Sequence, residues 1–117
     1  MIIRKEERNS EIKSNLKGGE GNLNFTYICS KEQTFNKIKM FATATLKKND
    51  SIGYHTHIGE KEIMLVNKGQ GLYNDDGVET MVNPGDVLIC EEGHYHSITN
   101  INDDELETIA MIIEKGA

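Results

Sequence analysis

The sequence predicts an all-β protein, an antiparallel barrel or sandwich of short strands, and three observations support this. Residues 38–46 alternate between apolar and mostly polar side chains, the two-residue period of a strand with one buried face. Turn-forming pairs such as Asp76-Gly77 and Pro84-Gly85 recur at short intervals. Residues 106–113 are rich in β-branched side chains. Short strands with such punctuation are typical of closed or two-layered antiparallel sheets.

The strands are expected in a simple order along the chain. Asn74-Asp75-Asp76-Gly77 predicts a hairpin turn, because Asp-Gly tolerates positive φ. Asn83-Pro84-Gly85-Asp86 fits a type II turn, with proline and glycine at its central positions. The expected strands are residues 25–28, 38–46, 62–66 with a continuation through 72–73, 78–82, 87–90, 95–99 and 106–113.

The first 24 residues differ from the rest. Residues 1–17 are highly charged and could hold a short helix, and Gly18-Gly19-Glu20-Gly21 then interrupts the chain. We therefore divide the sequence into an N-terminal arm, residues 1–24, and a single barrel domain, residues 25–117.

Composition excludes several classes of protein. The 117 residues suffice for one domain, and 37% hydrophobic and 27% charged residues are ordinary for a globular chain. A net charge of −6 argues against binding nucleic acid or anionic lipid. No apolar run is long enough for a membrane helix or a signal peptide, so we expect a cytoplasmic protein with reduced cysteines. Cys29 is expected to have a structural role. Cys90 is expected either to have a structural role or to line a cavity.

Histidines and one glutamate form the candidate site. His55 and His57 are two residues apart, so on a strand both imidazoles point to the same face. Glu62 begins the next expected strand, after a turn through residues 58–60, and His96 comes from a later strand. These residues predict a site for one divalent transition metal, because imidazole and carboxylate suit Mn, Fe, Co, Ni, Cu or Zn. The set leaves coordination positions open for a small molecule.

Two further residues compete for places in this site. His94 forms a second His-x-His pair with His96, but it follows Gly93 directly and is expected at the rim. Glu60 could replace Glu62, although only Glu62 begins a strand in our reading. Glu62 is also the one candidate for a catalytic base.

These residues resemble the two sequence motifs of the cupins. His55, His57, Glu62 and Gly69 match the first motif, with Asn49 in place of its leading glycine. In the second motif Gly85, Gly93, His96 and Asn100 match, with Glu91 in place of a proline. The resemblance implies a double-stranded β-helix (jelly-roll) barrel that holds its metal with His55, His57, Glu62 and His96. Small cupins commonly form homodimers, so we expect a dimer in which residues 23–30 add to the neighbour's sheet.

Aromatic residues surround the expected site. Tyr54 and Tyr95 neighbour ligands on their strands, so they should point away from the metal. Tyr73, Phe41 and Met40 are candidate cavity liners, although core packing is the favoured role for each.

The substrate is constrained by the positive charges. The chain has two arginines, Arg4 and Arg8, both in the arm, and arginine is the usual partner of carboxylates and phosphates. The lysines at 37, 39, 47, 48, 61 and 68 are interpreted as solvated strand-end charges. The pocket is therefore expected to be poor in cations, which disfavours a sugar-phosphate isomerase and favours a neutral polar or metal-chelating ligand. Three hypotheses remain: a metal-dependent enzyme such as an oxygenase or isomerase, a non-catalytic binding or sensing module, and a metal-free barrel.

Overall fold

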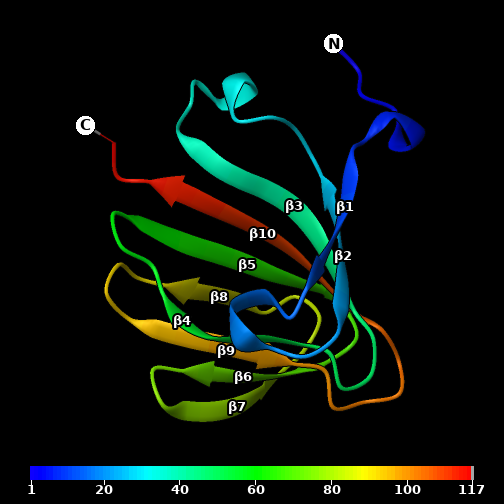
Figure 1. Ribbon diagram of the computed structural model, residues 1–117, viewed down its shortest axis with the longest axis vertical. Coiled ribbons are helices and arrows are strands. Elements are labelled where there is room, and N and C mark those ends of the chain that lie inside the picture. Colours follow the sequence, from blue (N-terminus) through cyan, green and yellow to red (C-terminus); the bar gives the residue numbers. More distant parts are fainter. Residues whose placement is uncertain (117) are drawn as a thin grey trace.

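The computed structural model describes residues 1–116, which form two antiparallel sheets (Figure 1). The larger sheet has six strands in the order β1-β2-β3-β10-β5-β8, and the smaller has four in the order β4-β9-β6-β7. The strands are β1 (Ser10–Ser14), β2 (Asn22–Tyr27), β3 (Ile38–Leu46), β4 (Ser51–Thr56), β5 (Glu60–Lys68), β6 (Gly71–Asp75), β7 (Val78–Val82), β8 (Val87–Cys90), β9 (Tyr95–Thr99) and β10 (Leu106–Glu114). Three short 3-10 helices complete the fold: η1 (Lys5–Glu7), η2 (Leu16–Gly18) and η3 (Glu32–Thr34).

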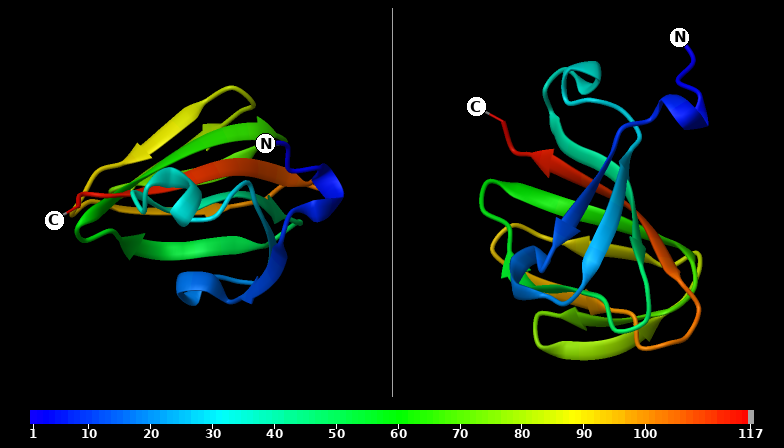
Figure 2. Two further views of the ribbon diagram at one scale, coloured as in Figure 1. Left: turned by 90° about the horizontal axis from the view of Figure 1, so that it is seen from above. Right: turned by 45° about the vertical axis from the view of Figure 1, so that its right-hand side comes forward.

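The sheets face each other and enclose the core, which confirms the predicted all-β jelly roll (Figure 2). The alternation predicted for 38–46 is observed, since Ala42, Ala44 and Leu46 are buried on one face of β3. The largest buried side chains of the core include Phe25, Leu23, Leu46, Ile98 and Leu106.

One expected continuation is wrong. Leu72 and Tyr73 do not extend the strand that begins before residue 62, because β5 ends at Lys68 and β6 starts at Gly71 in the other sheet. Gly69 has φ of 76° between them, and a Cβ at this position would overlap the Glu105 carbonyl. The chain crosses between the sheets at this glycine.

The N-terminal residues form two strands as well as short 3-10 helices. β1 lies within residues 1–17, where a short helix was expected, and η1 and η2 are each only three residues long. Ser10–Ser14 pair with Asn22–Thr26 in one antiparallel ladder, so the boundary expected after residue 24 falls inside β2. Within residues 1–116, none of the helices has the length and apolarity needed to cross a membrane.

A close backbone contact holds η2 against β4. Gly19 and Gly53 face each other, and a Cβ on either would overlap backbone atoms of the other segment, including Ser51 O and Lys17 O. Glycine at both positions therefore lets the N-terminal segment rest directly on the strand that carries His55.

Candidate metal centre

The structure brings His55, His57, Glu62 and His96 together from both sheets. His55 lies on β4 in register with His96 on β9, and Glu62 lies on β5 in the larger sheet. His57 follows the last residue of β4. One nitrogen or oxygen atom from each residue lies within 4.8 Å of the other three, so the four side chains converge on one point between the sheets.

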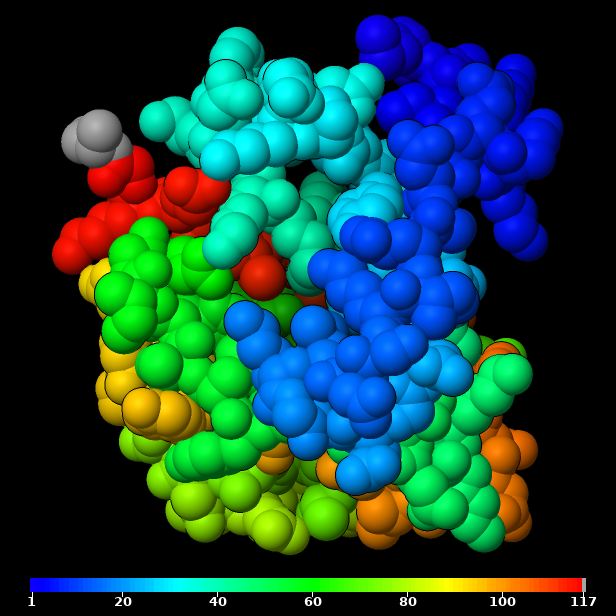
Figure 3. All heavy atoms as spheres, viewed as in Figure 1, coloured from blue at the N-terminus to red at the C-terminus, as the bar shows by residue number. Residues whose placement is uncertain are grey.

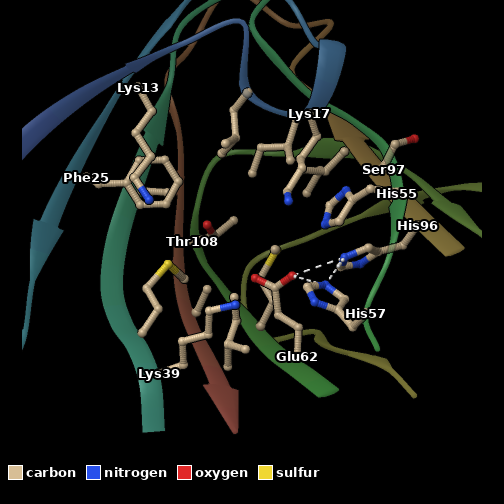
Figure 4. Close-up of a pocket in the computed structure, with 18 of the residues that line it drawn as sticks. Lys13, Lys17, Phe25, Lys39, His55, His57, Glu62, His96, Ser97 and Thr108 are labelled. Atoms are coloured by element: carbon tan, nitrogen blue, oxygen red, sulfur yellow. Dashed lines mark hydrogen bonds and ion pairs between the residues drawn. The ribbon is translucent and has the colours of Figure 1, made fainter. Parts of the chain in front are cut away.

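The contacts within this cluster are short (Figure 4). Glu62 Oε1 is 3.1 Å from His57 Nε2 and 3.0 Å from His96 Nε2. The two Nε2 atoms are 3.1 Å apart. His57, Glu62 and His96 are 4%, 6% and 3% exposed, so water screens these contacts little.

Each imidazole is held by its other ring nitrogen. His55 Nδ1–H donates to the Gly53 carbonyl at 2.7 Å, and His57 Nδ1–H donates to Glu60 Oε2 at 2.6 Å. His96 Nδ1 is 2.8 Å from the Tyr73 hydroxyl. Carbonyl and carboxylate oxygens only accept, so when the ring is neutral, Nε2 of His55 and of His57 carries a lone pair that faces the cluster.

The cluster is strongly coupled electrostatically. Burial by itself raises the pKa of Glu62, but hydrogen bonds from His57 and His96 outweigh it and lower this pKa to about 2. The hydrogen bond with Glu62 raises the pKa of His57 against the effect of burial, and Glu60 adds to it. Burial lowers the pKa of His55, partly opposed by the Gly53 carbonyl.

The residues present fit a divalent cation. When the imidazoles are neutral, their lone pairs and the buried carboxylate repel one another unless a positive charge, from a proton or a cation, lies between them. Two ligand atoms each about 2.1 Å from an ion, at a right angle, lie about 3.0 Å apart, which matches the separations of 3.0–3.1 Å in the cluster. Anchored second nitrogens are a general feature of metal-binding histidines.

The competing residues lie outside the cluster. His94 is exposed and points outward, with Nδ1 3.0 Å from Asp76 Oδ2. Glu60, not Glu62, is the first residue of β5, and Glu60 holds His57 from behind instead of facing the centre. Tyr54 and Tyr95 point away and stack on each other with ring centroids 5.2 Å apart.

Four further residues considered as cavity liners can be placed in the structure. Tyr73 does more than pack in the core, since its hydroxyl contacts His96. Met40 lines the cavity beside the cluster, whereas Phe41 and Cys90 do not. The buried Cys90 thiol points toward the carbonyls of Glu91 and His94.

The cavity above the cluster is not poor in cations, which corrects the expectation drawn from the missing arginines. It has a volume of about 300 Å³, and Lys13, Lys17 and Lys39 line it. Figure 3 shows its opening as a hollow framed by the blue N-terminal segment, β3 and the green residues around the β4–β5 connection.

Lys39 reaches this cavity because β3 is irregular. Ile112 pairs with Met40 and Ile113 pairs with Ile38, so Lys39 is left unpaired at a β-bulge. A bulge redirects a side chain that strict alternation would place on the outer face. Lys39 Nζ binds Glu60 Oε1 at 2.9 Å, and it thereby contacts the carboxylate that orients His57.

The remaining motif residues shape the backbone. Asn49 has φ of 70°, a conformation that glycine adopts freely and asparagine tolerates, which explains the substitution seen in the sequence. Asn100 is fully buried and donates to the carbonyls of Leu46 and Asp104, both at 2.9 Å. The backbone N–H of Gly93 donates to the His57 carbonyl at 2.9 Å, which fixes the position of that ligand.

Comparison with known proteins defines the class first. Residues 42–112 match the family model of the cupin domain, and this chain belongs to the cupin family. The fold and the histidine–glutamate cluster agree with that assignment.

Particular relatives can then be named. The chain is 37% identical over 113 residues to the oxalate-binding protein of Thermotoga maritima, covering 97% of this chain and 93% of the relative. A crystal structure described as a predicted oxalate decarboxylase, also from Thermotoga maritima, superposes with a TM-score of 0.92 at 37% identity, covering 97% and 99% of the two chains. The polyketide cyclase RemF of Streptomyces resistomycificus shares the fold at 13% identity, with a TM-score of 0.80 and 99% and 80% coverage.

Proposed function

We propose that this protein binds oxalate, or a similarly small carboxylate, through a divalent transition metal held by His55, His57, Glu62 and His96. The observation that carries the proposal is the convergence of the four ligand atoms at the floor of a cavity whose other charged groups include three lysines. A bound divalent ion would supply open coordination positions for carboxylate oxygens. The 37% identical relative is named for binding oxalate, which supports the choice of ligand.

The lysines explain why an anion is favoured. Three imidazoles and one carboxylate leave a divalent ion with net positive charge, and Lys13, Lys17 and Lys39 add to the positive potential of the cavity. Glu60 subtracts from it, but its two oxygens are occupied by His57 and Lys39. A cavity walled largely by apolar groups strengthens the attraction of a dianion.

Binding without turnover is the version that the cavity supports best. Among its described lining residues, Glu62 faces the point where the four candidate ligands converge, and Glu60 is held between His57 and Lys39. Tyr27 is hydrogen-bonded to Glu11, and burial and this contact raise the Tyr27 pKa to about 12. Neither Glu60 nor Tyr27 is therefore poised to exchange protons near neutral pH.

The central experiment compares two histidines two residues apart. His96→Ala should lose the metal and with it oxalate binding, whereas His94→Ala should keep both, because the His94 side chain bonds to Asp76 and lies outside the four-residue cluster. Metal content is measured on protein purified without an affinity tag, and oxalate binding by calorimetry with and without added Mn²⁺ or Co²⁺. Less than about a tenth of an equivalent of metal, with no binding of added metal, would contradict the proposal.

Turnover is tested on the same protein. Formate, carbon dioxide and hydrogen peroxide are measured after incubation with oxalate, and oxygen uptake is followed across a panel of diols and dicarboxylates. We expect tight binding and no products. Sustained turnover would make the protein an enzyme, and an oxygenase if oxygen is consumed.

The dimer remains a prediction. The larger sheet ends in β1 and β8, and exposed apolar side chains lie on both: Ile12 on β1, and Val87 and Ile89 on β8. A second copy of the chain that pairs through the N-terminal strands would cover the first of these edges. Sedimentation velocity should show a dimer, and a monomer at micromolar concentration would contradict this.

A further inference from the structure

The side of the cavity away from Glu62 has polar groups that the metal centre does not use. Figure 4 shows Lys13 and Phe25 on one side, His57, Glu62 and His96 on the other, and Thr108 between them. Phe25 on β2 is separated from Glu62 on β5 by the two strands β3 and β10. Three strand spacings correspond to about 14 Å between the two backbones, so this end is a separate region of the cavity.

Two lysines that the metal centre does not use add positive charge to the cavity. The Lys13 ammonium lies 4.6 Å from the centroid of the Phe25 ring, and its nearest carboxylate, on Glu11, is 3.9 Å away. Within residues 1–116, Lys17 has no acidic partner in salt-bridge range. Its ammonium points into the cavity on the side of His55 (Figure 4).

Thr108 provides a second, independent observation. Thr108 is fully buried and lines the cavity, and its hydroxyl has no hydrogen-bond partner within residues 1–116. A buried hydroxyl without a partner costs free energy, about 1–3 kcal/mol in proteins, and native structures rarely leave one unexplained. A ligand oxygen placed between the two sides of the cavity would satisfy it.

Apolar side chains line the stretch between the two polar ends. Ala44 and Ala110 lie on the central strands β3 and β10, and their small side chains leave the volume open. Met40 and Met64 complete these walls. Cavities of about 300–1,000 Å³ hold ligands much larger than oxalate, and this one has a volume of about 300 Å³.

We propose that Lys13, Lys17 and the Thr108 hydroxyl bind a second carboxylate, so that the cavity selects dicarboxylates with a methylene spacer, one carboxylate at the metal and the other on the side of Lys13. This inference rests on the proposed metal-dependent binding of a carboxylate at the four-residue cluster. The spacer lies against Ala44, Ala110 and the methionines. Oxalate, which lacks a spacer, reaches only one of the two ends.

The test is a calorimetric series on Mn²⁺- or Co²⁺-loaded protein. The probes are oxalate, malonate, succinate, glutarate and adipate, with butyrate and pentanoate as monocarboxylates matched in length to succinate and glutarate. We expect at least one longer dicarboxylate to bind about tenfold or more tighter than its matched monocarboxylate, because the second carboxylate makes charged hydrogen bonds. An affinity no greater than that of the monocarboxylates would overturn the inference.

Variants assign the preference to the named residues. Lys13→Met and Lys17→Met keep the aliphatic length of each side chain, and together they should reduce the dicarboxylate preference to about twofold or less. Thr108→Val is nearly isosteric and should cost about fivefold in dicarboxylate affinity. Lys68→Met, at the exposed end of β5, is the matched control and should retain the full preference. A preference that survives the double lysine variant would contradict the subsite.

The two proposals fail in different ways. Oxalate that does not bind the metal-loaded protein would contradict the proposed function. Oxalate that binds, combined with no lysine-dependent preference for longer dicarboxylates, would overturn the second subsite alone.

Discussion

The candidate metal ligands and the lysines of the cavity come from different parts of the chain. Residues 42–112, which match the cupin domain, contain all four candidate metal ligands. Lys13, Lys17 and Lys39 all precede that range. The family pattern thus accounts for the candidate metal ligands, whereas the positive charge that would select a ligand comes from β1, η2 and the start of β3.

The two sets of residues also differ in how firmly they are held. His57, Glu62 and His96 are buried, and each histidine has a second partner that fixes its ring. Lys17 is exposed and Lys13 is partly exposed on a flexible side chain. A rigid centre suits a metal ion that demands fixed geometry, and mobile ammonium groups suit ligands of varying length.

The largest expected effect comes from the rigid centre. Glu62→Gln keeps the shape of the side chain but removes the charge that neutralises a divalent ion. We expect metal affinity to fall by more than about 100-fold, beyond the range typical of residues that only orient a ligand. Titration calorimetry measures it, and Glu79→Gln on exposed β7 is the control. Unchanged affinity in Glu62→Gln would remove Glu62 from the ligand set.

Substitutions behind the ligands should have intermediate effects. Glu60→Gln removes a charged acceptor from His57 Nδ1, and we expect a loss of about 10–100-fold in metal affinity. Tyr73→Phe removes a neutral partner of His96 and should cost less than Glu60→Gln. Tyr54→Phe, on the exposed outer surface, controls for loss of a hydroxyl. Negligible losses of metal affinity in both variants would show that holding the histidine rings contributes nothing to metal binding.

Metal affinity should also depend on pH in a defined direction. A metal replaces the proton on His57, whose pKa is raised above 6.5 by Glu62 and Glu60, so affinity should decline as the pH falls from above 6.5. The decline approaches about tenfold per pH unit for one displaced proton. In the metal-free protein, His57 stabilises the fold at low pH, and this contribution is lost as the pH rises through its folded pKa.

Glu60→Gln sharpens this test. It removes one of the carboxylates that raise the His57 pKa, so the decline in affinity should move to lower pH. Coincident pH profiles for the two proteins would show that Glu60 does not act on His57. Competition with a chromogenic chelator gives both profiles.

The smallest expected change in metal affinity comes from a substitution in the N-terminal segment. Gly19→Ala places a methyl group against the backbone of β4, and we expect a loss of about 1–3 kcal/mol in unfolding free energy from overpacking. Metal affinity should change by less than about twofold, while the preference for longer dicarboxylates weakens because Lys17 is displaced. Gly18→Asn, where nothing crowds the Cβ and φ is 81°, is the control. A preserved preference in Gly19→Ala would separate the position of η2 from ligand selection.

Two kinds of sequence pattern predicted features that the structure contains. The period of two in 38–46 and the turn residues gave the all-β class, because each depends only on local geometry. The spacing of His55, His57, Glu62 and His96 predicted residues that the fold brings together. A metal site needs particular side chains at particular intervals, which leaves a trace in one sequence.

No such sequence pattern predicted the lysines that line the cavity. Lys39 enters the cavity through a bulge that depends on the pairing of β3 with β10, and a single strand does not reveal its partner's register. Lys13 and Lys17 lie in a charged segment that resembles a solvated arm until β1 pairs with β2. Tyr73 looked like an ordinary core residue because its hydroxyl finds its partner on another strand, β9.

The contact between Gly19 and Gly53 makes the N-terminal segment an exchangeable part. This contact is made by backbone atoms, so it requires glycine at two positions, and at position 17 it uses the carbonyl and not the side chain. Lys17 has φ of 56°, which glycine, asparagine and aspartate adopt most readily, so lysine could be exchanged for an acidic or a small residue without rebuilding the candidate metal centre. One scaffold could in this way give rise to a series of binding proteins that differ in their ligand and share the same four metal-binding side chains.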